Sequence, residues 1–191
     1  MCVDIVELSR KEYQDYELVF EYDTAEHYAV EVRQEERSFT VALRRLPLPE
    51  PQHKRFVEYL FQRYLARPSA YAILKDGKLA AIIEIDREFW SKRMRIADLV
   101  VWPEYRRRGY GAALLGQALS IARAEGFRAV YLDTHSCNVD AIDFYLSQGF
   151  VLGGLDTTYY SNRDVECGEV YIEMVYIFDD ERSMNWRYQQ E

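Results

Sequence analysis

The sequence is 191 residues long, and its 49% hydrophobic and 29% charged residues are typical of a globular protein that buries a core without disulfide or metal staples. Its 24 lysines and arginines against 32 aspartates and glutamates give a formal net charge of −8, which argues against a broadly basic nucleic-acid binder. The charge is uneven: residues 1–37 carry 4 basic and 11 acidic groups, residues 38–128 carry 17 and 9, and residues 129–191 carry 3 and 12. A basic middle between acidic ends suggests one anionic and one cationic ligand, although solvated faces of unequal charge give the same pattern.

The cysteines and the apolar runs indicate the compartment. Cys2, Cys137 and Cys167 show neither a Cys-x-x-Cys pair nor clustered His/Cys spacing. No apolar run approaches the roughly 18 residues that span a bilayer, and no basic segment followed by an apolar stretch opens the sequence. We therefore expect reduced thiols in a cytoplasmic protein with no membrane role and no metal site.

The first 69 residues are predicted to hold strands and helices. Residues 3–8 indicate a strand, and the polar residues 9–16 are compatible with a helix. Residues 28–32 and 39–45 are typical of an antiparallel strand pair. The three prolines of residues 47–51 should end this pattern, because proline fixes φ and removes a backbone donor.

A helix and a hairpin are predicted next. Residues 52–67 carry aromatic and apolar side chains at helical spacing, which predicts an amphipathic helix stopped by Pro68. Residues 71–75 and 78–86 then flank Asp76-Gly77, a dipeptide that tolerates the positive φ angles of a type I′ turn. This is the clearest hairpin signal in the sequence.

The second half alternates strands with helices. The predicted elements are strand 95–101, helix 111–124, strand 129–134, helix 139–148, and strands near 150–154 and 170–177. The pattern indicates an α/β or α+β fold with mixed strand directions. We see no repeat or linker, so we expect a single domain over residues 1–191, with a core at about 70–178 and a polar tail at 179–191.

A glycine turn before the helix at 111–124 is suited to binding phosphate. Arg106-x-x-Gly109-x-Gly111 lets the main chain approach a ligand, and the first helix amides lack intrahelical acceptors. A P-loop is excluded, because neither its lysine nor its hydroxyl follows Gly111. A dinucleotide fingerprint is disfavoured by Leu114, although Asp133 imitates its ribose-binding acid. Arg106 to Arg108 could equally be a solvated basic turn.

A second motif follows the next predicted strand. It reads Asn138-x-x-Ala141-x-x-Phe144-Tyr145-x-x-x-Gly149-Phe150. The offset of seven residues places the Asn138 amide and the Tyr145 hydroxyl on nearly one side of a helix. The alternative is a core aromatic on a helix that Asn138 caps and Gly149 ends. The two roles of Asn138 are compatible.

Together these two motifs resemble the GNAT superfamily of acetyl-CoA-dependent N-acetyltransferases. The match covers residues 70–178 approximately, and two independent motifs at the right spacing make it specific. Within that superfamily, residues 150–160 with Trp90 and the turn from Glu104 are similar to the streptothricin (nourseothricin) acetyltransferases. The resemblance implies a mixed, mostly antiparallel central sheet with one splayed parallel strand pair, flanked by helices.

The resemblance also implies a cofactor and its contacts. Acetyl-CoA would lie between strands 95–101 and 129–134, with its pyrophosphate on the glycine turn. The residues implied in CoA binding are Leu99, Val100, Val101, Arg106, Arg107, Arg108, Gly109, Tyr110, Gly111, Ala112, Asn138, Ala141 and Tyr145.

Acetyl transfer needs a base for the amine and an acid for the leaving thiolate. Tyr145 is our candidate for the acid, and a plain core aromatic is the alternative. Asp98 and Glu84 are candidate bases that could equally have surface or structural roles. The oxyanion would be held by a strand amide near Val100, exposed at a bulge.

An acceptor amine is the expected partner, since carboxylates and aromatic faces suit a cation. The candidate contacts are Asp133, Asp156, Tyr159 and Trp90, with plain packing of a tyrosine-rich sheet as the alternative. We expect N-acetylation of a cationic small molecule, of which streptothricin is the specific guess. Polyamines, aminoglycoside-like amines and protein N-termini are other acceptors, and a non-catalytic acyl-CoA-binding module is the alternative class. We expect no nucleic-acid or membrane partner and leave a homodimer open.

Overall fold

A computed structural model describes residues 3–178 of the chain. The elements, in chain order, are β1 (Ile5–Leu8), α1 (Arg10–Tyr13), β2 (Glu17–Glu35), β3 (Ser38–Tyr59), β4 (Ser69–Lys75), β5 (Lys78–Glu88), β6 (Arg93–Val101), a 3-10 turn (Pro103–Tyr105), α2 (Tyr110–Ala124), β7 (Ala129–His135), α3 (Val139–Ser147), β8 (Val151–Asp156), α4 (Asp164–Cys167) and β9 (Tyr171–Ile177). Contacts divide these residues into two compact units, which are 3–20, 57–132 and 176–178 on the one hand, and 21–56 and 133–175 on the other. The predicted tail at 179–191 lies outside the described residues.

The first unit is built on a mixed sheet with the strand order β1-β4-β5-β6-β7. β1, β4, β5 and β6 pair antiparallel, and β6 pairs with β7 in parallel. The hairpin between β4 and β5 turns at Asp76 and Gly77, whose φ angles of 52° and 76° are those of the predicted type I′ turn. A mostly antiparallel sheet with one parallel pair confirms the fold class that the sequence indicates.

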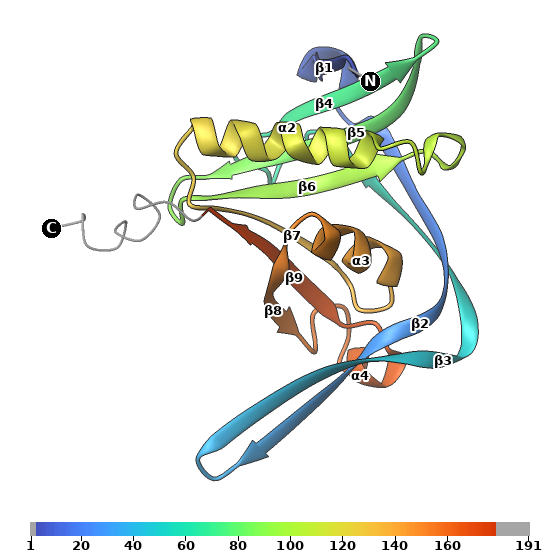
Figure 1. The fold of residues 1–191 in the computed structure, drawn as a ribbon, viewed down its shortest axis with the longest axis vertical. Helices are drawn as coiled ribbons and strands as arrows, with labels where there is room; N and C mark the ends of the chain where they lie inside the picture. Colours follow the sequence, from blue (N-terminus) through green and yellow to red (C-terminus); the bar gives the residue numbers. More distant parts are fainter. Residues whose placement is uncertain (1–2, 179–191) are drawn as a thin grey trace, which may run out of the picture. The chain divides into compact units, whose positions relative to one another are not determined.

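The parallel pair is short. Its register runs from Arg93 opposite Ala129 to Arg95 opposite Tyr131. β6 then continues to Val101 beyond the last of these pairs (Figure 1). The edge of β6 that follows Arg95 is therefore not part of this ladder, as the predicted splayed strand pair requires.

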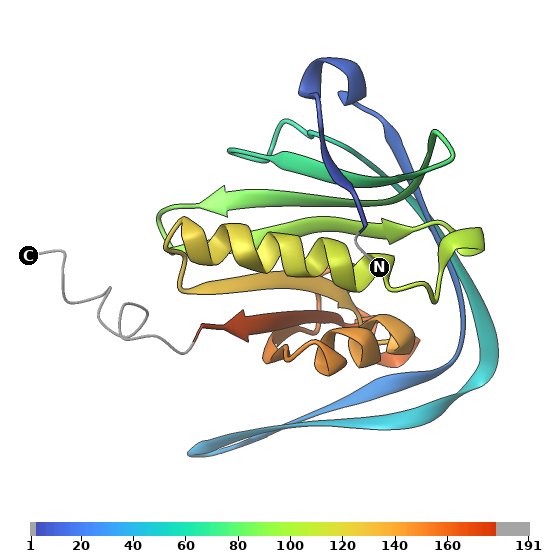
Figure 2. The same cartoon turned by 45° about the horizontal axis from the view of Figure 1, so that its top comes forward.

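Helix α2 packs on the middle strands of this sheet, β4, β5 and β6 (Figures 1 and 2). Its apolar stripe is fully buried at Leu114, Leu115, Ala118 and Ala122. Side chains three to four residues apart lie on one helix face, which is why this spacing anchors α2 to the sheet. No helix within residues 3–178 is long and apolar enough to cross a membrane.

One sheet face carries an apolar cluster together with two acidic residues. The cluster consists of Leu8, Leu18, Leu60, Phe61, Ala70, Ala72, Ile82 and Val100. Directly opposed residues of an antiparallel pair point to the same face. Glu84 opposes both Ala70 and Asp98, and Ile82 opposes Val100, so the two carboxyl groups follow the apolar residues along the same face.

The second unit contains helix α3 and the antiparallel pair of β8 and β9. Asn138 caps α3, since its side chain accepts a hydrogen bond from the Ala141 amide at 3.3 Å. Gly149 follows the helix with a φ of 89°, a left-handed conformation that ends it. These features confirm the predicted helix and both of its ends. Helix α4 was not predicted.

Strands β2 and β3 differ most from the sequence-based prediction. They form a separate two-stranded sheet, of which the predicted pair at 28–32 and 39–45 is only a part. The predicted helix at 52–67 is wrong, because β3 continues to Tyr59 and turns follow. The prolines do not end the strand either. Among residues 3–178, β3 pairs only with β2 and so has one free edge, and Pro47, Pro49 and Pro51 at alternate positions can be tolerated in such an edge strand.

Candidate active site

The glycine turn of the first unit has a conformation suited to an anion. Arg107 and Gly109 have φ angles of 62° and 81°, both in the left-handed region. Left-handed residues in a turn can direct successive backbone amides toward one side, as in the nests that bind anions. The first intrahelical bond of α2 is donated by Ala113 to the Gly109 carbonyl at 3.0 Å. The amides of Tyr110, Gly111 and Ala112 therefore have no acceptor within the helix.

Two of the three arginines hold the turn in place. The Arg106 Nε donates to the Val101 carbonyl at 3.2 Å, which ties the turn to the end of β6. The Arg108 guanidinium donates to the Glu104 carbonyl at 2.9 Å and lies 5.6 Å from the centre of the Tyr105 ring. The side chain of Arg107 is exposed. Arg106 and Arg108 are exposed as well, so all three predicted cofactor-binding arginines face solvent.

The end of β6 is regular at the predicted cofactor contacts. Leu99, Val100 and Val101 pair in sequence with Ile83, Ile82 and Ala81 of β5. The predicted bulge at Val100 lies instead at Ala97, since Asp98 opposes Glu84 while Ile96 opposes the next residue, Ile85. The amide displaced by a bulge is thus three residues earlier than expected.

Two carboxyl groups lie together on this sheet. Glu84 and Asp98 are directly opposed, with exposed fractions of 0% and 8%. Burial raises the pKa of Glu84 to about 7, against the lowering effect of a hydrogen bond from the Phe61 amide. Burial, and then the charge of Glu84, raise the pKa of Asp98 well above its usual range. With a pKa of about 7, Glu84 exchanges protons near neutral pH, which a general base requires.

Phe61 fixes one end of the pair. Its amide donates to the Glu84 Oε1 at 2.8 Å, and its carbonyl accepts from the Gln14 side chain at 2.9 Å. The φ angle of Phe61 is 59°, an unusual value for a bulky residue, while the ring is buried in the apolar cluster. The long-range bonds hold this strained backbone. No sequence pattern indicates this role of Phe61, because residues 52–67 resemble a helix.

The predicted acid Tyr145 is a buried residue of α3 in the second unit. Its exposed fraction is 7%, and its ring lies 5.6 Å from that of Phe150 and 5.1 Å from that of Phe144. Asn138 and Tyr145 lie on the same helix, seven residues apart. Burial in aromatic surroundings suits a neutral phenol that donates its proton, and it also suits a core residue.

The predicted acceptor residues are distributed over both units. Asp133 is half-buried at the end of β7, and its charge contributes to a raised pKa of the Tyr160 hydroxyl, for which burial is the main cause. Asp156 is exposed, and its carboxylate accepts the Thr158 amide at 2.8 Å to form a turn. The Tyr159 ring lies 4.5 Å from that of Tyr171. In the first unit, Trp90 is 77% exposed in the turn between β5 and β6.

A small pocket of about 100 Å³ opens beside Asn138 in the second unit. β2 lines it with Tyr22, Asp23, Thr24, Ala25 and Glu26, β3 with Arg45, and the start of α3 with Val139 and Asp140. Arg45 pairs with Glu26 at 2.7 Å and with Asp143 at 2.8 Å. The carboxylates of Asp23 and Asp140 also line the pocket and make it acidic. The acidic opening segment of the sequence thus contributes to a pocket, which its composition alone does not reveal.

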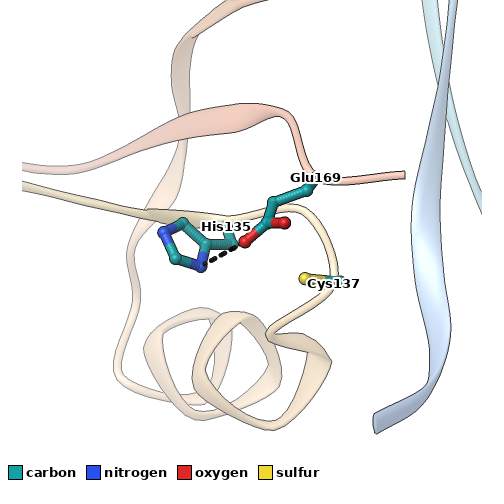
Figure 3. A group of neighbouring side chains, drawn as sticks. All are labelled: His135, Cys137 and Glu169. Atoms are coloured by element: carbon teal, nitrogen blue, oxygen red, sulfur yellow. Dashed lines mark ion pairs between the residues drawn. The ribbon is translucent and has the colours of Figure 1, made fainter. Parts of the chain in front are cut away.

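Sequence reasoning also missed a polar cluster in the second unit. The His135 ring lies close to Cys137 and Glu169 (Figure 3). The His135-x-Cys137 spacing was the one local signal. Glu169 is too distant in the sequence to be joined to it by any pattern.

Comparisons with known proteins agree with this geometry. The model of the acetyltransferase (GNAT) family matches residues 7–150. The chain is 37% identical over 76 residues to streptothricin acetyltransferase A of Bacillus subtilis, which covers 40% of this chain and 44% of that protein. It is 34% identical over 95 residues to streptothricin acetyltransferase of Streptomyces lavendulae, which covers 50% of each. The matches thus span half or less of these relatives.

Solved structures extend the similarity over the whole fold. A crystal structure of nourseothricin acetyltransferase superposes with a TM-score of 0.72 at 27% identity, covering 93% of this chain and 99% of that one. A structure from Bacillus anthracis, described as a streptothricin acetyltransferase in complex with acetyl coenzyme A, has the same fold, with a TM-score of 0.70 at 23% identity and coverage of 94% and 99%. With the family model matching more than half of its length, the chain belongs to the acetyltransferase (GNAT) family.

Proposed function

We propose that the protein transfers the acetyl group of acetyl-CoA to a primary amine of a cationic small molecule, specifically a streptothricin-type antibiotic, and so confers resistance. The conformation of the turn from Arg106 to Ala112 carries this proposal. Its left-handed residues and the free amides at the start of α2 fit the pyrophosphate of CoA. Family membership supports the same cofactor.

Further residues would complete the cofactor site. The backbone of Leu99, Val100 and Val101 would pair with the pantetheine along the edge of β6, and Arg107 would add charge near the phosphates. Arg106 and Arg108 would act by holding the turn, given their bonds to main-chain carbonyls. Asn138, Ala141 and Tyr145 of α3 stay predicted contacts.

The chain's own residues would move the protons of the reaction. The amine nitrogen forms a bond to the acetyl carbon while the bond from that carbon to sulfur breaks. Glu84 or Asp98 would accept the proton that the amine loses, through water, since both are buried and have raised pKa values. Tyr145 would donate a proton to the departing thiolate.

The acceptor is proposed from charge and from the relatives. Two similar proteins are named streptothricin acetyltransferases, and the acidic pocket beside Asn138 would suit a cationic amine. Asp133, Asp156, Tyr159 and Trp90 stay candidate contacts. A cytoplasmic location and a homodimer also stay predictions.

Thiol release tests this function directly. Purified protein is incubated with acetyl-CoA and streptothricin, and free CoA is measured with a thiol reagent. We expect turnover on streptothricin that exceeds turnover on spermidine, kanamycin and a peptide with a free N-terminus. Turnover only on another amine in this panel would overturn the specific acceptor. Saturable acetyl-CoA binding without turnover on any amine would identify a non-catalytic binding module instead.

A further inference from the structure

Three donor groups of the second unit converge in a way that acetyl transfer does not require. His135 ends β7, Cys137 follows two residues later, and Glu169 precedes β9. Their ligand atoms all lie within 4.8 Å of one another. Figure 3 shows the imidazole nitrogen and a carboxylate oxygen facing each other, with the sulfur beside them. Nitrogen, sulfur and oxygen donors of these types are the ligands that zinc takes in proteins.

The Tyr22 hydroxyl provides a fourth donor, an oxygen, at the same point. It lies 3.2 Å from the His135 Nδ1 and 3.7 Å from the Cys137 Sγ, and the Glu169 Oε1 lies 3.4 Å from the His135 Nδ1. Zinc bound at about 2.0–2.1 Å from nitrogen and oxygen and about 2.3 Å from sulfur places neighbouring donors of a tetrahedron about 3.3–3.6 Å apart. The three observed distances are close to those edges.

The surroundings orient these donors. Lys54 donates to the Glu169 Oε2 at 2.8 Å, which leaves Oε1 directed to His135. The His135 ring is held between Phe56 at 5.4 Å and the edge of Tyr160 at 4.8 Å. Bonds and packing that fix the ligands in this way are the usual second layer of a metal site. The Glu169 carboxylate balances the positive charge of Lys54. A Cys137 thiolate would balance it further once the metal binds.

We propose that His135 Nδ1, Cys137 Sγ and Glu169 Oε1 bind a zinc ion, with the Tyr22 hydroxyl at the fourth position. The site lies wholly within the second unit and joins β2, the end of β7 and the segment before β9. Such an ion would link segments that are more than one hundred residues apart in sequence, and this proposal is independent of the acetyl acceptor.

Equilibrium dialysis of the untagged full chain against Zn²⁺, followed by metal analysis, tests the site. We expect one zinc per chain, and an affinity at least about tenfold lower in Cys137→Ser and His135→Ala. Cys167→Ser is the matched control, because Cys167 is the other free cysteine among the described residues and is exposed. It should bind zinc like the original chain. Binding that survives Cys137→Ser, or that is lost equally in Cys167→Ser, would overturn the proposal.

Cobalt substitution tests the site in the original chain, so its result does not depend on whether a variant folds. Co²⁺ bound by a thiolate absorbs in the near ultraviolet through sulfur-to-metal charge transfer. We expect this absorption to appear in the original chain with one equivalent of Co²⁺ and to be displaced by Zn²⁺. Its absence would refute thiolate ligation even if some zinc binds elsewhere. Because neither assay measures acetyl transfer, their failure would leave the proposed function untouched.

Discussion

Glu84 and Asp98 oppose each other across the β5–β6 ladder, buried beside the bulge at Ala97. Two carboxyl groups in such a place cannot both ionise at low cost. The pair therefore makes the stability of the first unit depend on pH. One of its members, Asp98, lies on β6, the strand that would carry the cofactor.

Glu84→Gln tests this linkage. The pKa of Glu84 is about 7 in the folded protein against an ordinary 4.5, so the folded state binds more protons between these values. Stability should therefore fall as pH rises from about 4.5 to 7, by on the order of 3 kcal/mol from this group. The variant should flatten this fall, as measured by urea unfolding at several pH values. Exposed Glu36→Gln, which changes net charge equally, should keep it. An unchanged pH profile in Glu84→Gln would contradict the assignment.

Gly109→Ala tests the phosphate turn. A Cβ at Gly109 would meet no atom within 4 Å, so the only penalty comes from the left-handed φ of 81°. That penalty, roughly 1–2 kcal/mol, should shift the turn and raise the KM for acetyl-CoA about tenfold. Gly77→Ala is a matched control, with a φ of 76° and equally open space in the β4–β5 turn. It should lose similar stability with KM unchanged. If the two variants have an equal KM for acetyl-CoA, the turn is not a phosphate site.

Tyr145→Phe separates an acid from a core aromatic. Removal of the hydroxyl should lower kcat by about 100-fold if it protonates the thiolate, with little change in CoA affinity. Tyr176→Phe is the control, because Tyr176 of β9 packs on Phe178 and has no proposed role in catalysis. If the protein only binds acetyl-CoA, or if Tyr145 is only structural, the two variants should not differ in rate or in CoA affinity. Steady-state rates together with CoA titration distinguish these cases.

Asp133→Asn tests recognition of a cationic acceptor. Loss of a half-buried charge should raise the KM for streptothricin about tenfold, while the KM for acetyl-CoA stays constant. Asp156→Asn should have a smaller effect, since the exposed Asp156 accepts the Thr158 amide in its own turn and asparagine can do the same. A larger effect at Asp156 would move the cationic contact from the end of β7 to the end of β8.

Local signals predicted the β4–β5 hairpin and much of the second half of the chain. Asp76-Gly77, Asn138 and Gly149 each act within a few residues, and all three were read correctly because their backbone requirements are local. The extent of β3 could not be predicted, since aromatic spacing typical of a helix is overridden by pairing with β2. The Tyr22–His135 contact joins residues 113 positions apart, and only the fold creates it.

The alternate prolines of β3 have a consequence for solubility. A free strand edge normally offers N–H groups to which another chain can add, which is how sheets aggregate. Pro47, Pro49 and Pro51 have no N–H group to donate, so that stretch of β3 lacks three of the donors that an incoming strand would need. This part of β3 is therefore a poor template for a further strand.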